Sequence, residues 1–171
     1  MAERESVYRR STELIPSGVA VDDVDRGLLA ALQQDATQSY AALAQAVGLS
    51  TGAAHERVRK LREQGVIRRT TVDVDPAAVD RGVLAFVLVE ANAWMGDRPT
   101  HEALAALPEV EEAHVIAGPA SLLVKIRVGT PEQLQAGLRR LFQLDGVTGT
   151  RTIVVLETFF DRPLDPYPPN P

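Results

Sequence analysis

Two short helical segments joined by a very short turn constrain the first half of this sequence most strongly. Apolar residues recur at helical spacing over residues 40–47 and again after Ser50, with Gly48 between the two runs. Glycine adopts the left-handed conformation at little cost and can end a helix, while a serine hydroxyl can cap the next one. The run over residues 23–34 predicts a preceding helix. Three short helices with a tight turn between the second and third form a helix-turn-helix.

The third helix is expected over residues 51–64, with Ala54, Val58 and Leu61 facing inward. Residues 66–74 are rich in β-branched side chains, which favour strands. They predict a strand, or a pair of short strands folding back, as a wing on the helices.

From about residue 76 onward, expected strands alternate with expected helices. The strands are predicted over residues 83–91, 110–116, 122–128 and 147–160, and the helices over 99–107 and 131–142. The order strand, helix, strand, strand, helix, strand is that of a ferredoxin-like domain.

The predicted fold class is therefore α+β, with an N-terminal winged helix-turn-helix domain and a C-terminal ferredoxin-like βαββαβ domain. The expected divisions are a flexible arm over residues 1–20, the helical domain over 21–75, the ferredoxin-like domain over 76–160 and a proline-rich tail over 161–171.

Composition excludes several classes of protein. The 171 residues include no cysteine and three histidines, so the sequence offers neither a disulfide nor a convincing metal site. No catalytic motif is present, and Glu111 and Glu112 are expected to point apart as neighbours on a strand. No run of apolar residues could span a bilayer, and the start has no secretory signal. We expect a cytoplasmic protein that is not an enzyme and has no cofactor, metal or membrane partner.

The net charge of −5 conceals a basic segment between His55 and Arg69, which holds six lysines and arginines against two glutamates. A helix fits the major groove of double-stranded DNA, so the third helix is the expected reader. An exposed charged face can equally be an ordinary solvated face. The sequence does not divide the arginines between phosphate contacts and base reading. The candidate DNA-binding residues are Ser50, Thr51, Gly52, Ala53, Glu56, Arg57, Arg59, Lys60, Arg68 and Arg69.

Three segments of the helical half carry a family resemblance. They read DDVDRGLLAALQQD from Asp22, SYAALAQAVGLS from Ser39 and HERVRKLREQGVI from His55. This sequence resembles the Lrp/AsnC family of transcription factors, and LAALPEVEEAHVIAG from Leu104 resembles the second domain of that family. The resemblance implies homodimers that pair through the sheets of the second domain and often assemble into octamers. It also implies a small effector, typically an amino acid, bound between dimers.

The sequence departs from the family pattern directly after Gly118. The family commonly has two acidic residues there, and none follows in this chain. We expect an effector pocket formed by backbone groups instead, although Gly118 and Pro119 can equally form a simple hairpin turn. The candidate effector-binding residues are Ala117, Gly118, Pro119, Ala120 and Ser121, with Thr150 and Thr152 as weaker candidates.

The predicted function is that of a sequence-specific, DNA-binding transcriptional regulator whose oligomerisation domain senses a small effector. The alternative is a ligand-sensing or protein-interaction module that does not bind DNA.

Overall fold

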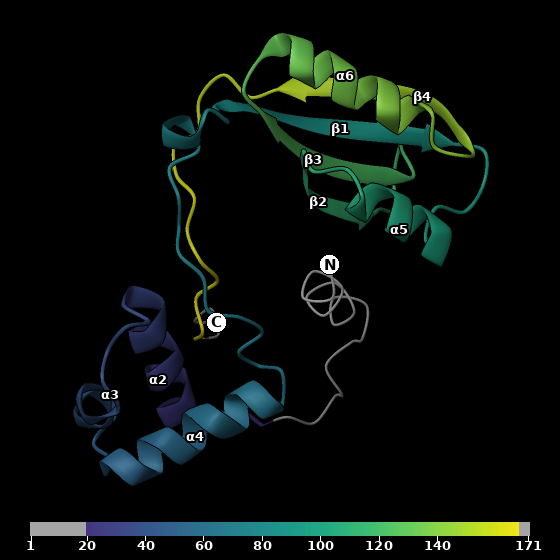
Figure 1. Ribbon diagram of the computed structural model, residues 1–171. Helices are drawn as coiled ribbons and strands as arrows, with labels where there is room; N and C mark the ends of the chain where they lie inside the picture. Colours follow the sequence, from purple (N-terminus) through teal and green to yellow (C-terminus); the bar gives the residue numbers. More distant parts are fainter. Residues whose placement is uncertain (1–19, 168–171) are drawn as a thin grey trace. The chain divides into compact units, whose positions relative to one another are not determined.

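The computed structural model describes residues 20–167 and divides the chain into two compact units (Figure 1). The first unit holds the described residues up to Val72 together with those from Asp161 onward, and the second is Asp73–Phe160. The boundary lies three residues before the expected one. Apart from Ala20, the predicted N-terminal arm lies outside the described residues.

The first unit is a three-helix domain, as the spacing of the apolar residues predicted. Its helices are α2 (Asp23–Gln34), α3 (Tyr40–Val47) and α4 (Thr51–Glu63). The side chains of Asp22, Ser39 and Ser50 cap their N-termini. Gly48 ends α3 at a φ of +69°, which directs the chain into α4 after two more residues. The helix-turn-helix is therefore confirmed, around a core that includes Leu28, Leu43 and Val58.

The predicted wing is wrong. The backbone N–H of Ile67 donates to the Leu61 carbonyl at 3.0 Å, and the Ile67 side chain packs against the helical core. Residues 68–75 then form no strand, and Val72 and Val74 are exposed. β-branched residues stabilise a strand only where a neighbouring strand supplies hydrogen bonds, and no described segment pairs with this one.

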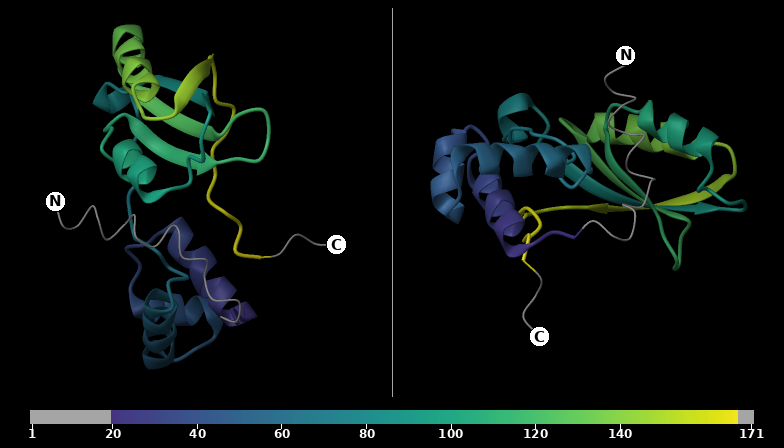
Figure 2. Two further views of the ribbon diagram at one scale, coloured as in Figure 1. Left: turned by 90° about the vertical axis from the view of Figure 1, so that its right-hand side faces the viewer. Right: turned by 90° about the horizontal axis from the view of Figure 1, so that it is seen from below.

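The second unit is the predicted ferredoxin-like domain. After the short 3-10 helix η1 (Ala77–Val79), its elements are β1 (Val83–Ala91), α5 (Arg98–Ala105), β2 (Val110–Val115), β3 (Leu122–Val128), α6 (Pro131–Phe142) and β4 (Val147–Val154). The four strands form an antiparallel sheet in the order β2-β3-β1-β4. Both helices cover the same face of the sheet, and the other face is left open (Figure 2).

Alternate residues of the central strands form the core of this unit. Val87 and Val89 of β1, and Val124 and Ile126 of β3, are buried beneath the helices. A strand with one covered face alternates in this way, because successive side chains point to opposite faces.

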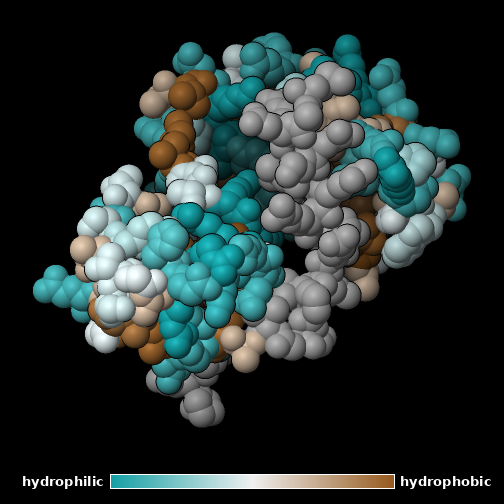
Figure 3. All heavy atoms as spheres, turned by 60° about the horizontal axis from the view of Figure 1, so that its bottom comes forward, coloured by the Kyte–Doolittle hydropathy of each residue, from teal (hydrophilic) through white to brown (hydrophobic). Residues whose placement is uncertain are grey.

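The last strand is shorter than predicted. It ends at Val154, and the N–H of the next residue, Val155, donates to the carbonyl of Leu84 at 2.9 Å. Its partner strand β1 begins at Val83, so later residues have no ladder to join. Leu156, Phe159 and Phe160 are consequently exposed. Figure 3 shows hydrophobic surface in separate patches among mostly hydrophilic side chains.

The proline-rich tail has contacts of its own with α2, within the first unit. The Gln33 side-chain amide donates to the Leu164 carbonyl at 2.9 Å, and the Arg26 guanidinium donates to the Pro166 carbonyl. A Cβ at Gly27 would lie 3.7 Å from the Tyr167 hydroxyl. Residues 164–167 therefore lie along one side of α2, so ordered packing continues past Asp161.

The expectation that Glu111 and Glu112 point apart is also wrong. The β2–β3 register shifts between Val110 and Glu112, which interrupts the alternation of side chains. Lys125 Nζ consequently lies 3.5 Å from Glu111 and 2.9 Å from Glu112. The two carboxylates share one cation on the open face of the sheet.

Candidate functional site

The first turn of α4 is open to solvent. Ser50 Oγ accepts a hydrogen bond from the backbone N–H of Ala53 at 3.3 Å. Thr51, Gly52 and Ala53 are exposed, and a Cβ on Gly52 would meet no atom within 4 Å. A ligand can therefore approach this turn closely, and the positive end of the helix dipole favours an anion there.

The two sides of α4 differ as the helical spacing predicted. Ala54, Val58 and Leu61 are buried in the domain. Glu56, Arg59, Lys60 and Glu63 lie on the other side, with about half of each side chain exposed. Their position leaves them available to a partner that lies along the helix.

Arg59 is bound by two glutamates of its own helix. Its Nε lies 2.8 Å from Glu56 Oε2 and its Nη2 lies 2.6 Å from Glu56 Oε1, while Nη1 donates to Glu63. These hydrogen bonds raise the pKa of Arg59, chiefly through Glu56, and the bond to Arg59 lowers the pKa of Glu56. Lys60 is only loosely paired, with Nζ 3.8 Å from Glu56 Oε1.

Arg57 faces the start of α2 rather than the outward side of α4. Its Nη1 donates to Asp22 Oδ2 at 2.7 Å and to Asp25 Oδ1 at 2.8 Å. The hydrogen bonds that Arg57 donates to Asp25 and then to Asp22 raise the pKa of Arg57. The pKa of Asp22 is lowered, mainly by the N–H of Asp25 and next by Arg57. The structure therefore separates Arg57 from the other candidate DNA-binding residues.

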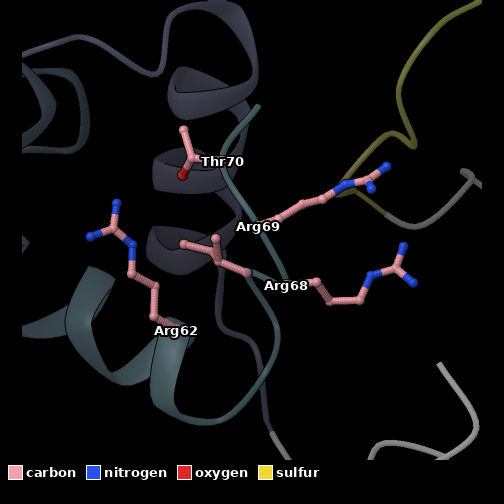
Figure 4. A pocket seen from close by; sticks show the side chains of 5 residues that line it. Arg62, Arg68, Arg69 and Thr70 are labelled. Atoms are coloured by element: carbon pink, nitrogen blue, oxygen red, sulfur yellow. The ribbon is translucent and has the colours of Figure 1, made fainter. Parts of the chain in front are cut away.

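Arginines from the end of α4 and the following segment surround a hollow of about 220 Å³, lined by Arg62, Ile67, Arg68, Arg69 and Thr70. Figure 4 shows Arg62 pointing away from Arg68 and Arg69, so the three side chains do not converge on one anion. They suit separate contacts along a phosphate backbone. Sequence reasoning missed Arg62, because its place directly after the buried Leu61 does not mark it as outward.

The candidate effector residues divide by their position on the sheet. In the loop between β2 and β3, the N–H of Ile116 donates to the carbonyl of Ser121 at 3.1 Å, and the N–H of Ser121 donates to Val89 at 2.9 Å. Thr150 pairs with Val89 from the other edge of β1, so β1 lies between Thr150 and the loop. Thr152 lies two residues along β4, about 7 Å farther away. The structure thus places both threonines across β1 from the loop, with Thr152 the farther of the two.

The backbone of the loop has free donors. Within the described chain, the N–H groups of Ala117, Gly118 and Ala120 donate no hydrogen bond to protein atoms. These residues and Pro119 lie outside regular structure, and all but Ala120 are exposed. Free backbone N–H groups can donate hydrogen bonds to a carboxylate.

Over residues 20–167, the structure contains no cluster of three potential metal ligands. None of its described helices is long and apolar enough to cross a membrane.

Comparison with known protein families identifies the family to which this chain belongs. Residues 21–62 match the AsnC-type helix-turn-helix domain, and residues 84–165 match the Lrp/AsnC ligand binding domain. The chain belongs to the Lrp/AsnC family. The matches cover both units, so this member of the Lrp/AsnC family combines a helix-turn-helix domain with a ligand-binding domain.

Relatives in the Lrp/AsnC family include the HTH-type transcriptional regulator FL11 of Pyrococcus horikoshii. It is 36% identical over 140 residues, which cover 82% of this chain and 92% of the relative. The regulatory protein AsnC of Escherichia coli is 33% identical over 147 residues, covering 85% and 97%. These relatives are named as regulators, not as enzymes.

Solved structures of the Lrp/AsnC family share the fold. The structure of E. coli AsnC has a TM-score of 0.78 at 29% identity and covers 85% of this chain and 99% of that one. The feast or famine regulatory protein of M. tuberculosis complexed with L-methionine has a TM-score of 0.76 at 31% identity, covering 83% and 96%. The family resemblance and the two-domain architecture read from the sequence are therefore confirmed, apart from the wing.

Proposed function

We propose that this protein is a sequence-specific transcriptional regulator that reads double-stranded DNA with α4. The observation that carries the proposal is the exposed side of α4, where an open, serine-capped first turn is followed by charged side chains. A helix of this kind enters the major groove with its N-terminal half against the bases. The names of the relatives support the same function.

The groups that contact DNA divide by environment. Ser50, Thr51, Gly52 and Ala53 approach the DNA most closely because they form the open first turn. Lys60, Arg62, Arg68 and Arg69 contact phosphates, since no carboxylate of the described chain holds any of them closely. Arg57 instead joins α4 to α2 and supports the domain.

The effector is a small molecule with a carboxylate, most simply an amino acid, that binds at the loop of residues 117–121. The free N–H groups of Ala117, Gly118 and Ala120 would hold the carboxylate. The M. tuberculosis relative complexed with L-methionine supports an amino acid as the ligand class.

Two copies pair through the open face of the sheet. Leu84, Phe86 and Leu88 alternate with the buried residues of β1 and face away from the helices, and Ile153 beside Phe86 is 52% exposed. The ion pairs of Lys125 border this apolar surface. Pairing would place two reader helices on one DNA site, and the family resemblance implies further assembly of dimers up to octamers. Such a regulator acts in the cytoplasm, where the DNA is.

Gel retardation with the DNA upstream of the protein's own gene tests DNA binding. We expect retardation at low salt that weakens steeply as salt rises, because bound lysines and arginines displace counterions. Absence of retardation would favour the alternative of a ligand-sensing or interaction module that does not bind DNA.

Titration calorimetry with the twenty amino acids tests the effector. At least one should release or absorb heat and change the oligomer size or the DNA affinity. If none does so, the effector part of the proposal fails while DNA binding stands.

A further inference from the structure

The hydrogen-bond donors of Arg59 are only partly used within α4. A guanidinium has five N–H donors in one plane. Glu56 accepts from Nε and from one N–H of Nη2, and Glu63 accepts from one N–H of Nη1. Two N–H groups remain, one on each terminal nitrogen.

The two remaining donors match one base edge in the major groove. Guanine presents two acceptors there, O6 and N7, and an arginine that donates to both makes the commonest specific contact in protein–DNA complexes. Adenine presents an acceptor beside a donor, and cytosine presents a donor, so neither accepts from both N–H groups. The free edge of Arg59 therefore selects guanine.

The charge around Arg59 argues against a phosphate as its partner. The guanidinium lies between the carboxylates of Glu56 and Glu63, so this trio carries more negative than positive charge. A phosphate approaching Arg59 would be repelled by both carboxylates, whereas the acceptors of guanine carry no net charge. Lys60, on the same side of α4, does not lie between two carboxylates, and 59% of its side chain is exposed.

Arg59 itself lies in the C-terminal half of α4, but its guanidinium reaches back toward Glu56 near the middle of the helix. Side chains on a helix lean toward its N-terminus, and the bidentate bond to Glu56, one turn earlier, holds the guanidinium in that direction. The N-terminal half of a reader helix is the part that approaches base edges. Glu56 and Glu63 therefore hold Arg59 in one orientation before DNA arrives.

We propose that Arg59 is a specificity-determining residue that reads a guanine in each half-site, with Glu56 and Glu63 as positioning residues. This inference rests on the proposed DNA-binding function. It assigns base reading to Arg59, whereas the sequence did not divide the arginines between phosphate contacts and base reading.

Selection of duplexes from a random library tests the proposal with the full chain and its Arg59→Lys, Glu56→Gln and Lys60→Gln variants. Glu102→Gln is a matched control, because Glu102 forms the same kind of exposed ion pair with Arg98 at 2.6 Å in the other unit. The wild type should select sites with a guanine at a defined place in each half-site. Arg59→Lys keeps the charge but loses the planar pair of donors, so the preference for that guanine should fall roughly tenfold or more.

The other variants separate positioning from charge. Glu56→Gln should weaken the preference for the same guanine and strengthen binding to random DNA, because it removes a repelling charge. Lys60→Gln should weaken binding to all sequences and keep the guanine preference. Glu102→Gln should change neither property. Glu63→Gln should act in the same direction as Glu56→Gln and provides a second test if one variant folds poorly.

The outcomes distinguish this inference from the proposed function. A wild type that selects no sequence would overturn both. A wild type that selects sites whose guanine is retained by Arg59→Lys would overturn the inference alone. Loss of a cytosine preference in Glu56→Gln, with the guanine unchanged, would make Glu56 itself the reader and overturn its positioning role.

Discussion

The Arg57 guanidinium lies 2.8 Å from the Asp25 carboxylate and thereby joins α4 to the first turn of α2. Asp25 is buried, and it also takes part in the capping box of α2 with Asp22. The pair links two of the three helices, and it accounts for an arginine that the charge pattern alone places among the DNA contacts.

We expect Arg57→Gln to lower the free energy of unfolding by roughly 1 kcal/mol, since Asp25 would lose a charged partner while half-exposed pairs contribute little. Thermal denaturation of the full chain measures this. Arg62→Gln is the control, because Arg62 forms no ion pair in the described chain and should leave stability unchanged. If Arg57→Gln leaves the stability unchanged but abolishes DNA binding, Arg57 is a DNA contact rather than a structural residue.

Arg69→Gln should weaken binding uniformly across DNA sequences. Each phosphate contact contributes about 0.9 to the magnitude of the slope of log K against log salt. The proposed dimer would lose one contact in each half-site, so the magnitude of the slope should fall by about 2. Binding titrations at several salt concentrations measure it. Arg139→Gln, an exposed arginine on α6, should leave the slope as it is. An unchanged slope in Arg69→Gln would show that Arg69 does not contact a phosphate.

Gln33→Ala should destabilise the helical domain, because the side chain of Gln33 binds the tail carbonyl of Leu164. The expected loss is about 0.5–1 kcal/mol, as for an ordinary hydrogen bond. Gln34→Ala is the matched control, since the neighbouring Gln34 is exposed and its side chain forms no hydrogen bond within residues 20–167. Deletion of residues 162–171 removes the same contact, so the backbone amides of α2 should exchange hydrogen faster. Equal stability of the two alanine variants would show that the tail contact contributes nothing.

Gly118→Ala should leave the fold intact while lowering affinity for the effector. A Cβ at Gly118 would meet no atom within 4 Å, and its φ does not require glycine. Any loss of amino-acid binding would therefore come from the added methyl group at the ligand site. Calorimetry measures the affinity, and thermal denaturation checks the fold. Unaltered binding would place the effector elsewhere.

The pair of Glu112 with Lys125 should make the stability of the second unit depend on pH. Lys125 lowers the pKa of Glu112, and Glu112 in turn raises the pKa of Lys125. A carboxyl with a lowered pKa contributes stability above its unfolded pKa and loses it as pH falls through the folded pKa. An amine with a raised pKa contributes below its unfolded pKa and loses the contribution as pH rises through the folded pKa. The pair should therefore stabilise the unit from about pH 5 to pH 10.

Glu112→Gln tests this dependence by thermal denaturation at pH 7 and pH 3. At pH 7 the variant should be less stable by about 1 kcal/mol or less, because both side chains remain partly exposed. At pH 3 the difference should shrink, as the wild-type carboxyl also becomes protonated. An equal difference at both values would mean that packing, not charge, stabilises this contact.

The sequence by itself determined the helices and most of the strands, and where most of them begin. Asp22, Ser39 and Ser50 cap their own helices, and Gly48 turns the chain, through contacts within a few residues. The burial of Ala54 and Val58 follows from helical spacing alone. Such features depend on local sequence, so they could be predicted without the fold.

Tertiary structure decided everything that depended on a distant partner. The strand propensity of residues 68–74 produced no wing, because no segment within residues 20–167 supplies the hydrogen bonds. The same dependence sets the roles of the arginines: Arg57 meets Asp25 from 32 residues away, while Arg59 meets only its own helix. Charge alone treats these residues alike, because a side chain's electrostatic partner is set by three-dimensional packing rather than by its own type.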